Sequence, residues 1–363
     1  MKQYKVCVYA ICKNEEKFVK RWYESIKDAD YICVLDTGST DNTVKLLKEL
    51  GVKVEVKEIN PWRFDVARNE SLKLIPKDAD ICIPLDLDEV LIPNSIDNLI
   101  KSWSDDVTRA KYIYNWKLDK DNKPIVSFYT NKIHSNNDYI WTHPVHEVLT
   151  YCGKSVQKEI LCNDVIINHY PDDSKSRGSY LKLLELSVKE DPLDDRNMHY
   201  LGREYMYYRK WNKCIDTLIK HLNLKTATWK DERCASMRFI ARSYRNLNRI
   251  EEAKMWLDKA ISEAPYLRDP YVEKAMLEYE LENWNEVIKN CNTALKITTH
   301  TKCYINETFS FDNTIYDLLS IAYFYLDDID NAIINIDKAL KMEPDNERLL
   351  KNKEIFIATK KTK

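Results

Sequence analysis

The sequence has few glycines and lacks the glycine-rich loops that bind phosphate. Only 5 of its 363 residues are glycine. Neither the dinucleotide-binding G-x-G-x-x-G pattern nor the P-loop pattern G-x-x-x-x-G-K-[ST] occurs. These absences exclude dinucleotide-type and kinase-type phosphate cradles. Together with 31% charged residues, the shortage of glycine indicates a helix-rich soluble protein.

The chain also lacks an excess of charge and a long apolar run. Its formal net charge is −2, which argues against a nucleic-acid-binding protein with a basic face. No apolar run approaches the roughly 18 residues that a membrane span requires, so we expect no stable membrane insertion. The apolar stretch 4–12 is short, has no small-residue cleavage site and runs directly into charged residues. We expect it to be a first strand, not a signal peptide.

The ten cysteines include no C-x-x-C pair. Cys7, Cys33 and Cys82 lie inside apolar, strand-like runs, where a free thiol behaves as a small hydrophobic group. This usage predicts a reducing, cytoplasmic location and argues against a structural zinc.

The first half of the chain alternates between strand and helix patterns, and 363 residues leave room for two domains. Strand patterns cover 5–11, 31–35, 52–58 and 81–85, with helical patterns over 15–27, 44–50 and 64–75. This alternation predicts an α/β domain with a parallel, right-handed sheet.

Three carboxylates follow the apolar strand 81–85. Asp86 and Asp88 are two residues apart, so in an extended chain their side chains leave the same face. Two carboxylates held this close repel one another unless a cation lies between them. Mg²⁺ or Mn²⁺ takes such oxygen ligands and keeps positions for substrate phosphates, and α/β sheets bind ligands at the carboxyl ends of their strands. A loop without a metal is the alternative.

A second candidate site begins at Asp36, where the strand 31–35 ends. Its carboxylate can bind a ribose or base, while N–H groups of the following turn, which includes Gly38 and Ser39, face a phosphate. The alternative is an ordinary strand-to-helix turn in which Thr40 or Asp41 caps the next helix.

Four motifs in order, ICKNEE, LDTGSTDNT, FDVARN and IPLDLDE, together resemble family 2 glycosyltransferases with the GT-A fold, a Rossmann-like and mainly parallel sheet. The resemblance covers about the first 90 residues. It implies a nucleotide-diphosphate sugar, UDP-linked, as the donor, with Mn²⁺ or Mg²⁺ as cofactor. The donor-binding residues that the resemblance implies are Asn14 and Glu15 at the base end, Asp36 on the uracil or ribose, Ser39 in the turn, Arg68 at the pyrophosphate, and Asp86 and Asp88 at the metal on the diphosphate. For Arg68 the alternative is a solvated charge on a helix.

The region 95–173 is rich in aromatic residues and contains the segment WTHPVHEV. His143 and His146 lack the H-E-x-x-H order, and Pro144 breaks the helix that such a zinc site requires. The VHE segment resembles one in the lipopolysaccharide-core and peptide-modifying branch of the same family, where it lies beside the transferred sugar. We expect Glu147 first and His146 second as the base that takes the acceptor's proton.

His169 follows the strand pattern 164–168. As in related GT-A enzymes, it is a candidate third metal ligand beside the two aspartates, with a capping or core histidine as the alternative. The polar stretch 172–178 marks the expected domain boundary and is a candidate lid over the diphosphate.

The second half of the chain is helical and repetitive. A tetratricopeptide (TPR) pattern of small, apolar and proline residues recurs at offsets 0, 3, 12, 16, 19 and 24 in 241–265 and 320–344. Ala275 and Ala294 mark a further copy, and Gly202, Tyr205 and Leu218 mark an earlier one. The stretch 298–311 is an insertion. We predict a GT-A domain at 1–173, an all-α TPR solenoid at 174–352, and a basic tail at 353–363.

A solenoid offers a concave face to an extended peptide or to a second copy of the chain. The layout resembles the S-glycosyltransferases of glycopeptide bacteriocins. We therefore predict an inverting glycosyltransferase that uses a protein or peptide acceptor, with a homodimer as a further possibility. Two alternatives are an interaction scaffold with an inactive transferase domain, and a transferase for a lipid-linked or polysaccharide acceptor.

Overall fold

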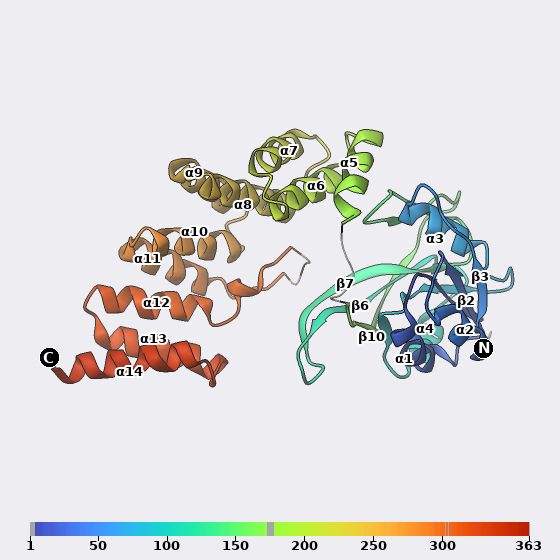
Figure 1. Cartoon of the computed structure of the whole chain (residues 1–363), viewed down its shortest axis with the longest axis horizontal. Helices are drawn as coiled ribbons and strands as arrows, with labels where there is room; N and C mark the ends of the chain where they lie inside the picture. Colours follow the sequence, from blue (N-terminus) through green and yellow to red (C-terminus); the bar gives the residue numbers. More distant parts are fainter. Residues whose placement is uncertain (1–3, 173–177, 302, 304, 363) are drawn as a thin grey trace. The chain divides into compact units, whose positions relative to one another are not determined.

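The computed structural model describes residues 4–172, 178–301, 303 and 305–362 (Figure 1). The chain divides into two compact units, residues 1–187 and 188–363. Each unit has its own hydrophobic clusters.

The first unit is built on a sheet with the strand order β3-β2-β1-β4-β7-β6-β10-β5. Strands β3, β2, β1 and β4 are parallel, and β7 runs antiparallel to both β4 and β6. The predicted α/β class with a mainly parallel sheet is confirmed. The elements are β1 (Val6–Cys12), α1 (Glu16–Ile26), β2 (Tyr31–Asp36), α2 (Thr43–Glu49), β3 (Lys53–Val56), α3 (Phe64–Leu72), β4 (Ile81–Pro84), β5 (Glu89–Leu91), α4 (Ser95–Ser102), β6 (Arg109–Leu118), β7 (Pro124–Ser135), β8 (Tyr139–Thr142), β9 (Val148–Tyr151), β10 (Glu159–His169) and α5 (Tyr180–Glu190).

Alternate side chains of the central strands enter two different cores. Val6, Val8 and Ala10 pack with residues of α1, α2 and α4 on one face, while Cys7 and Tyr9 pack with the segment after α3 and with the β8–β9 hairpin on the other. Both faces of the central strands β1 and β4 are covered, which explains their continuous apolar sequences.

The parallel register brings three strand ends to one edge of the sheet. Cys12 at the end of β1 pairs with Asp36 at the end of β2, and Tyr9 of β1 pairs with Pro84 at the end of β4. The polar segments that follow β1, β2 and β4 therefore leave the sheet together, as expected for the ligand-binding edge of such a sheet.

The second unit is a series of helices (Figure 1). Successive helices pack as pairs because small residues lie where they touch: Ala241, Ala253 and Ala260 are at most 2% exposed. A Cβ added at Gly202 would lie 2.2 Å from a methyl carbon of Leu218. The helices are α6 (Asp195–Tyr207), α7 (Trp211–Asn223), α8 (Lys230–Asn246), α9 (Ile250–Glu263), α10 (Asp269–Glu280), α11 (Trp284–Lys296), the 3₁₀ turn η1 (Thr308–Ser310), α12 (Thr314–Tyr325), α13 (Ile329–Met342) and α14 (Glu347–Thr362).

One expected segment differs from the structure, and another lies outside the described residues. The stretch 353–363, expected as a basic tail, continues helix α14 as far as Thr362. Phe356 is buried in the last core, and Lys360 Nζ lies 2.5 Å from a carboxylate oxygen of Asp330. Residues 173–177, which hold the predicted boundary and most of the candidate lid, lie outside the described residues.

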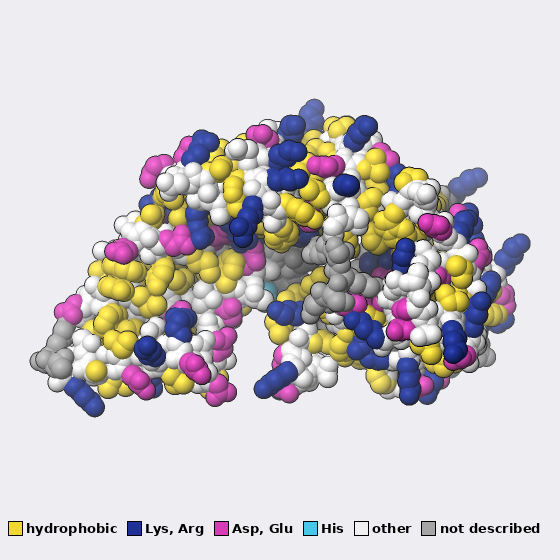
Figure 2. Space-filling model, in the orientation of Figure 1, with side chains coloured by type: hydrophobic (Ala, Val, Ile, Leu, Met, Phe, Trp, Pro, Cys, Tyr) yellow, Lys and Arg dark blue, Asp and Glu magenta, His cyan; other side chains and the backbone are white. Residues whose placement is uncertain are grey.

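The surface is mixed in character. Figure 2 shows basic, acidic and apolar side chains interspersed on the visible face of each unit. Across the described parts of the chain, no helix combines the length and the apolar character needed to cross a membrane.

Candidate functional site

The segments after β1 and β2 are joined by hydrogen bonds. Asn14 has a left-handed backbone (φ 55°), which asparagine tolerates better than most residues. Its N–H donates to Ser39 Oγ over 2.8 Å, and its side-chain oxygen accepts from the Thr40 N–H over 2.7 Å. The Glu15 N–H donates to Thr43 Oγ1 over 2.7 Å. The predicted base-end residues Asn14 and Glu15 and the predicted turn residue Ser39 thus lie in segments that are held together.

Asp36 is fully buried and binds its own turn. Its Oδ1 atom accepts hydrogen bonds from the N–H groups of Gly38 (3.0 Å) and Ser39 (2.9 Å), and its Oδ2 atom accepts from the Ser39 hydroxyl. Gly38 needs its glycine because φ is 103° there. Asp36 therefore shapes the turn, and its contact with a uracil or ribose stays a prediction.

Arg68 is the centre of the site. It lies on α3, is 5% exposed, and is not a solvated helix charge. Its two terminal nitrogens donate to the two carboxylate oxygens of Asp86 over 2.6 and 2.7 Å. Its Nε atom donates to Glu147 Oε1 over 3.0 Å, and the guanidinium carbon lies 5.3 Å from the centre of the Trp141 ring. One buried cation thus holds two of the predicted site carboxylates.

The ion pairs decide the charges of this cluster. Burial acts against ionisation of both Arg68 and Asp86, but their mutual attraction outweighs it. The pKa of Arg68 is raised well above its usual value, and Glu147 adds to this effect. Burial is the largest single influence and acts to raise the pKa of Asp86, but the charge and hydrogen bonds of Arg68, together with the charges of Lys132 and His169, lower it overall. Both groups are therefore charged at neutral pH.

Glu89, the last residue of the IPLDLDE motif but not a predicted site residue, supports the Asp-x-Asp turn from within. Its Oε2 accepts from the Asp86 N–H over 2.9 Å, and its Oε1 accepts from the Tyr114 hydroxyl over 2.7 Å. Burial, followed by the nearby charge of Asp86, raises the pKa of Glu89 to about 7. The signal in the sequence was only its place directly after Asp88.

His169, the last residue of β10, lies beside Asp88. Its Nε2 atom is 3.5 Å from an Asp88 carboxylate oxygen. Its Nδ1 atom is 3.1 Å from the carbonyl oxygen of Trp116, and the two rings stack with their centres 4.6 Å apart. A hydrogen bond from Nδ1–H to a carbonyl leaves Nε2 as the metal-binding atom of a neutral imidazole.

The three predicted metal ligands are brought together only in part. Asp88 and His169 face one another, but both oxygens of Asp86 are engaged by Arg68. Within the described residues, the group of three whose ligand atoms all lie within 4.8 Å of one another is found in the second unit instead. Carboxylate oxygens with one imidazole nitrogen nevertheless suit Mn²⁺ chemically. The metal assignment of Asp86, Asp88 and His169 stays a prediction.

The two candidate bases lie in the loop between β8 and β9. The carbonyl of Pro144 accepts a hydrogen bond from the Phe64 N–H over 3.0 Å, which fixes the loop to the start of α3. Glu147 faces Arg68, whereas the ring of His146 packs edge-on against Tyr180 of α5, with centres 5.7 Å apart. The structure thus places Glu147 in the cluster and His146 next to α5.

Lys132 on β7 adds a positive charge that sequence reasoning missed. Its charge acts to lower the pKa values of both Asp86 and Glu89. It lies near β4 because β7 pairs antiparallel with β4, at Cys82 and His134. Nothing in the sequence of a long alternating strand indicates which other strand it joins.

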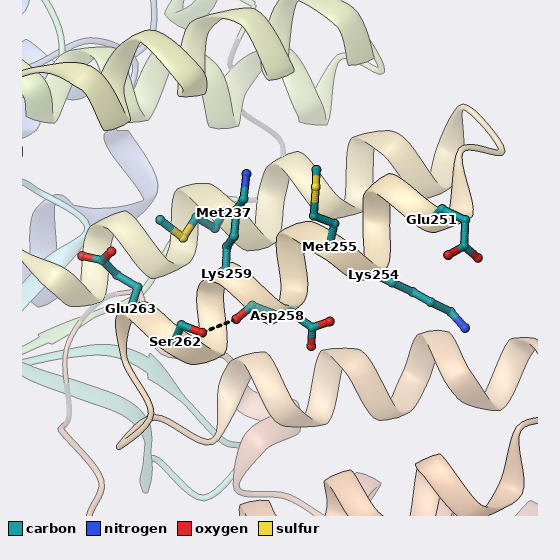
Figure 3. A pocket seen from close by; sticks show the side chains of 8 residues that line it. All are labelled: Met237, Glu251, Lys254, Met255, Asp258, Lys259, Ser262 and Glu263. Carbon is teal, nitrogen blue, oxygen red and sulfur yellow. Dashed lines mark hydrogen bonds between the residues drawn. The ribbon is translucent and has the colours of Figure 1, made fainter.

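A separate pocket of 750 Å³ lies in the second unit, on helices α8 and α9 (Figure 3). Charges of both signs and two methionines line it, and its Ser262 hydroxyl donates to the backbone carbonyl of Asp258 over 2.9 Å. None of the predicted site residues belongs to this pocket.

Comparison with known proteins identifies both parts of the chain. The model of the family described as glycosyl transferase family 2 matches residues 7–160. Residues 7–160 are a glycosyltransferase family 2 domain. The tetratricopeptide repeat model matches residues 239–266 and 314–346, so the predicted repeats in this transferase-containing chain are confirmed.

Several proteins similar to this chain are named as glycosyltransferases. An uncharacterised glycosyltransferase of Rickettsia bellii is 38% identical over 24% of this chain and 29% of its own length. The SPbeta prophage-derived glycosyltransferase SunS of Bacillus subtilis is 25% identical over 75% of this chain and 67% of its own length. The match to the Rickettsia relative thus spans less than a third of that protein. Among solved structures, the crystal structure of MamA protein is similar, with 18% identity and a TM-score of 0.36 over 46% of this chain and 83% of MamA.

Proposed function

We propose that this chain is a glycosyltransferase that moves a sugar from a UDP-linked donor to a protein or peptide side chain. The family 2 domain and the relatives named as glycosyltransferases support the activity. The observation that carries the proposal is the cluster in which buried Arg68 joins Asp86 and Glu147 at the strand ends. Charged groups are costly to bury, so their grouping at the ligand-binding edge favours a catalytic role.

The donor half of the proposal assigns a role to each strand end. Asn14, Glu15, Asp36 and Ser39 hold the base and ribose. Asp88 and His169, with the outward side of the Asp86 carboxylate, hold a divalent ion, Mn²⁺ or Mg²⁺. The Asp86 side chain is 33% exposed, which leaves that outward side accessible. When bound, such an ion offsets the negative charge of the departing nucleoside diphosphate.

The protein's own cations assist the same leaving group. Arg68 holds Asp86 in place through two hydrogen bonds, and the charge of Lys132 acts on Asp86 and Glu89. In this proposal Lys132 binds a phosphate oxygen of the donor. Arg68, whose nitrogens already donate to Asp86 and Glu147, serves mainly to position these carboxylates.

The acceptor half assigns the proton to Glu147. Its carboxylate is 12% exposed, and it takes the acceptor's proton as the acceptor attacks the sugar in line, so that the reaction inverts the sugar carbon. His146 is the second candidate. The repeat unit binds the peptide acceptor or a second copy of the chain. Ten free cysteines suit a reducing, cytoplasmic compartment.

The test measures hydrolysis and transfer with a panel of UDP-sugars, with and without Mn²⁺ or Mg²⁺. Asp88→Asn is expected to lose most metal-dependent turnover, because it removes a charged ligand. The matched control is Asp97→Asn, an exposed aspartate on α4, which is expected to keep full activity. Calorimetry with UDP and Mn²⁺ gives a second readout, since a scaffold with an inactive domain gives no binding heat. Full activity of Asp88→Asn contradicts the metal assignment.

A further inference from the structure

A cluster of polar side chains is buried inside the first helices of the second unit. His199 on α6 and His221 on α7 are 0% exposed, and Glu232 on α8 is 4% exposed. Burying a carboxylate and two imidazoles between helices costs free energy unless they have partners. This cluster lies in the repeat unit and shares no residue with the strand-end site.

Ser236 holds both imidazole rings. The Nδ1 atom of His199 lies 2.7 Å from Ser236 Oγ, and the Nδ1 atom of His221 lies 3.0 Å from the same oxygen. One hydroxyl oxygen has two lone pairs and can accept from two N–H groups. With Nδ1–H of both rings donating to Ser236, both Nε2 atoms present lone pairs.

The Nε2 atoms are the unexplained part of the cluster. In the described part of the chain, neither His199 Nε2 nor His221 Nε2 has a hydrogen-bond partner. His221 Nε2 lies 3.4 Å from the Glu232 Oε1 atom. Two ligands bound to tetrahedral zinc at about 2.0–2.1 Å are themselves roughly 3.3 Å apart. The His221–Glu232 spacing is therefore that of two ligands on one metal ion.

The third group lies within reach of the same point. One imidazole nitrogen each of His199 and His221 and one carboxylate oxygen of Glu232 lie within 4.8 Å of one another. This spacing is close enough for side-chain movements to bring the three groups onto one ion. Two imidazoles and a carboxylate are a donor set that zinc accepts. The hydroxyl of Ser236 acts as the outer partner that orients metal-binding histidines in known sites.

We infer that His199, His221 and Glu232 bind a divalent transition-metal ion of the zinc type. The ion ties α6, α7 and α8 together. Its role is structural, and it stabilises the first repeat of the solenoid, the helix pair α6–α7.

The test uses the full chain carrying Asp88→Asn, so that the strand-end site does not contribute its own metal. After treatment with a chelator and dialysis, Zn²⁺ is added and binding is followed by calorimetry and by the melting temperature. We expect one Zn²⁺ per chain and a higher melting temperature, because binding to the native state stabilises it. Co²⁺ in place of Zn²⁺ is expected to give visible absorption. Failure to bind Zn²⁺ overturns the inference.

Three variants and a control locate the site. His221→Gln and Glu232→Gln are expected to abolish Zn²⁺ binding, whereas His300→Gln, a change at an exposed histidine of the same unit, keeps it. If a ligand variant does not fold, as judged by circular dichroism, Ser236→Ala replaces it. That variant keeps all ligands and is expected to weaken Zn²⁺ binding about 10- to 100-fold. Unchanged affinity in Glu232→Gln and Ser236→Ala overturns the inference, whatever the transferase activity.

Discussion

At the scale of single residues, Arg68 joins two carboxylates of the candidate site. It neutralises Asp86 and Glu147 while being 5% exposed. Removing one partner of a buried ion pair is costly because the remaining charges lose their compensation. A lysine does not replace it, since it lacks the planar fork that reaches both carboxylates at once.

Arg68→Met is therefore expected to destabilise the first unit by about 3 kcal/mol and to abolish activity. The measurement is urea unfolding together with UDP-sugar turnover. Lys57→Met serves as control, because Lys57 forms a more exposed pair with Glu70 and is expected to change stability by less than about 1 kcal/mol. An Arg68→Met protein of normal stability contradicts the central role of this ion pair.

His134 gives the molecule a pH dependence that has no connection with catalysis. Its Nδ1–H donates to the Ser135 carbonyl over 2.7 Å, and its Nε2 accepts from the Tyr9 hydroxyl over 2.9 Å. Burial lowers the pKa of His134 to about 4. In the unfolded chain this histidine has its usual pKa of about 6.5. Between pH 6.5 and pH 4 the unfolded state therefore binds a proton that the folded state does not, and stability falls as the pH falls.

The wild-type protein is thus expected to lose up to about 2 kcal/mol from this group as the pH falls from 6.5 to 5. In His134→Gln, whose amide has no proton to take up, the loss over this interval is expected to be smaller. Urea unfolding at several pH values between 7.5 and 5 measures both slopes. Equal slopes in the two proteins would show that His134 does not cause the dependence.

At the scale of elements, the contact between α6 and α7 depends on the absence of a side chain at Gly202. The Cβ of any larger residue at position 202 would lie 2.2 Å from a methyl carbon of Leu218, and Leu218 is fully buried. Overpacking a core costs about 1–3 kcal/mol, whereas replacing glycine by alanine in a helix gains about 1 kcal/mol. The packing penalty is the larger effect.

Gly202→Ala is therefore expected to destabilise the second unit by up to about 2 kcal/mol, the packing penalty less the helix gain. Leu218→Ala alone is expected to cost about 2–5 kcal/mol through the cavity that it leaves. The double variant is expected to be more stable than the sum of the two changes predicts, because the new methyl group enters the vacated space. Simple additivity in thermal unfolding would contradict the proposed contact.

At the scale of the whole molecule, the two units have separate cores and separate proposed tasks. Helix α5 bridges their sequence boundary, which falls after residue 187. Tyr180 of α5 contacts both Phe64 and His146, with ring centres 5.9 and 5.7 Å apart. The start of α5 therefore belongs to the packing of the first unit.

A shortened protein ending at residue 192 is expected to retain metal-dependent hydrolysis of the UDP-sugar and to lose transfer to a peptide acceptor. The reason is that α5 stays with the donor site while the proposed acceptor-binding repeats are removed. Cooperative thermal unfolding confirms that the fragment is folded. Transfer at the full rate by a folded fragment would contradict the acceptor role of the repeats.

The sequence determined the features that depend on local periodicity. Strands and helices of the first unit follow from repeats of two and about 3.6 residues, and the solenoid follows from a recurring pattern of small residues. The position of Asp86 and Asp88 at a strand end follows from the same kind of pattern. These features need no knowledge of which distant elements meet.

Tertiary structure alone decided which charged groups are partners. Arg68 and Glu147 are 79 residues apart in the chain, and Ser236 is 37 residues from His199 and 15 from His221. Such pairs form because whole elements pack against one another and because buried charges need compensation. The sequence carries no periodic signal for that packing, so the ion-pair centre and the histidine cluster became visible only in the folded chain.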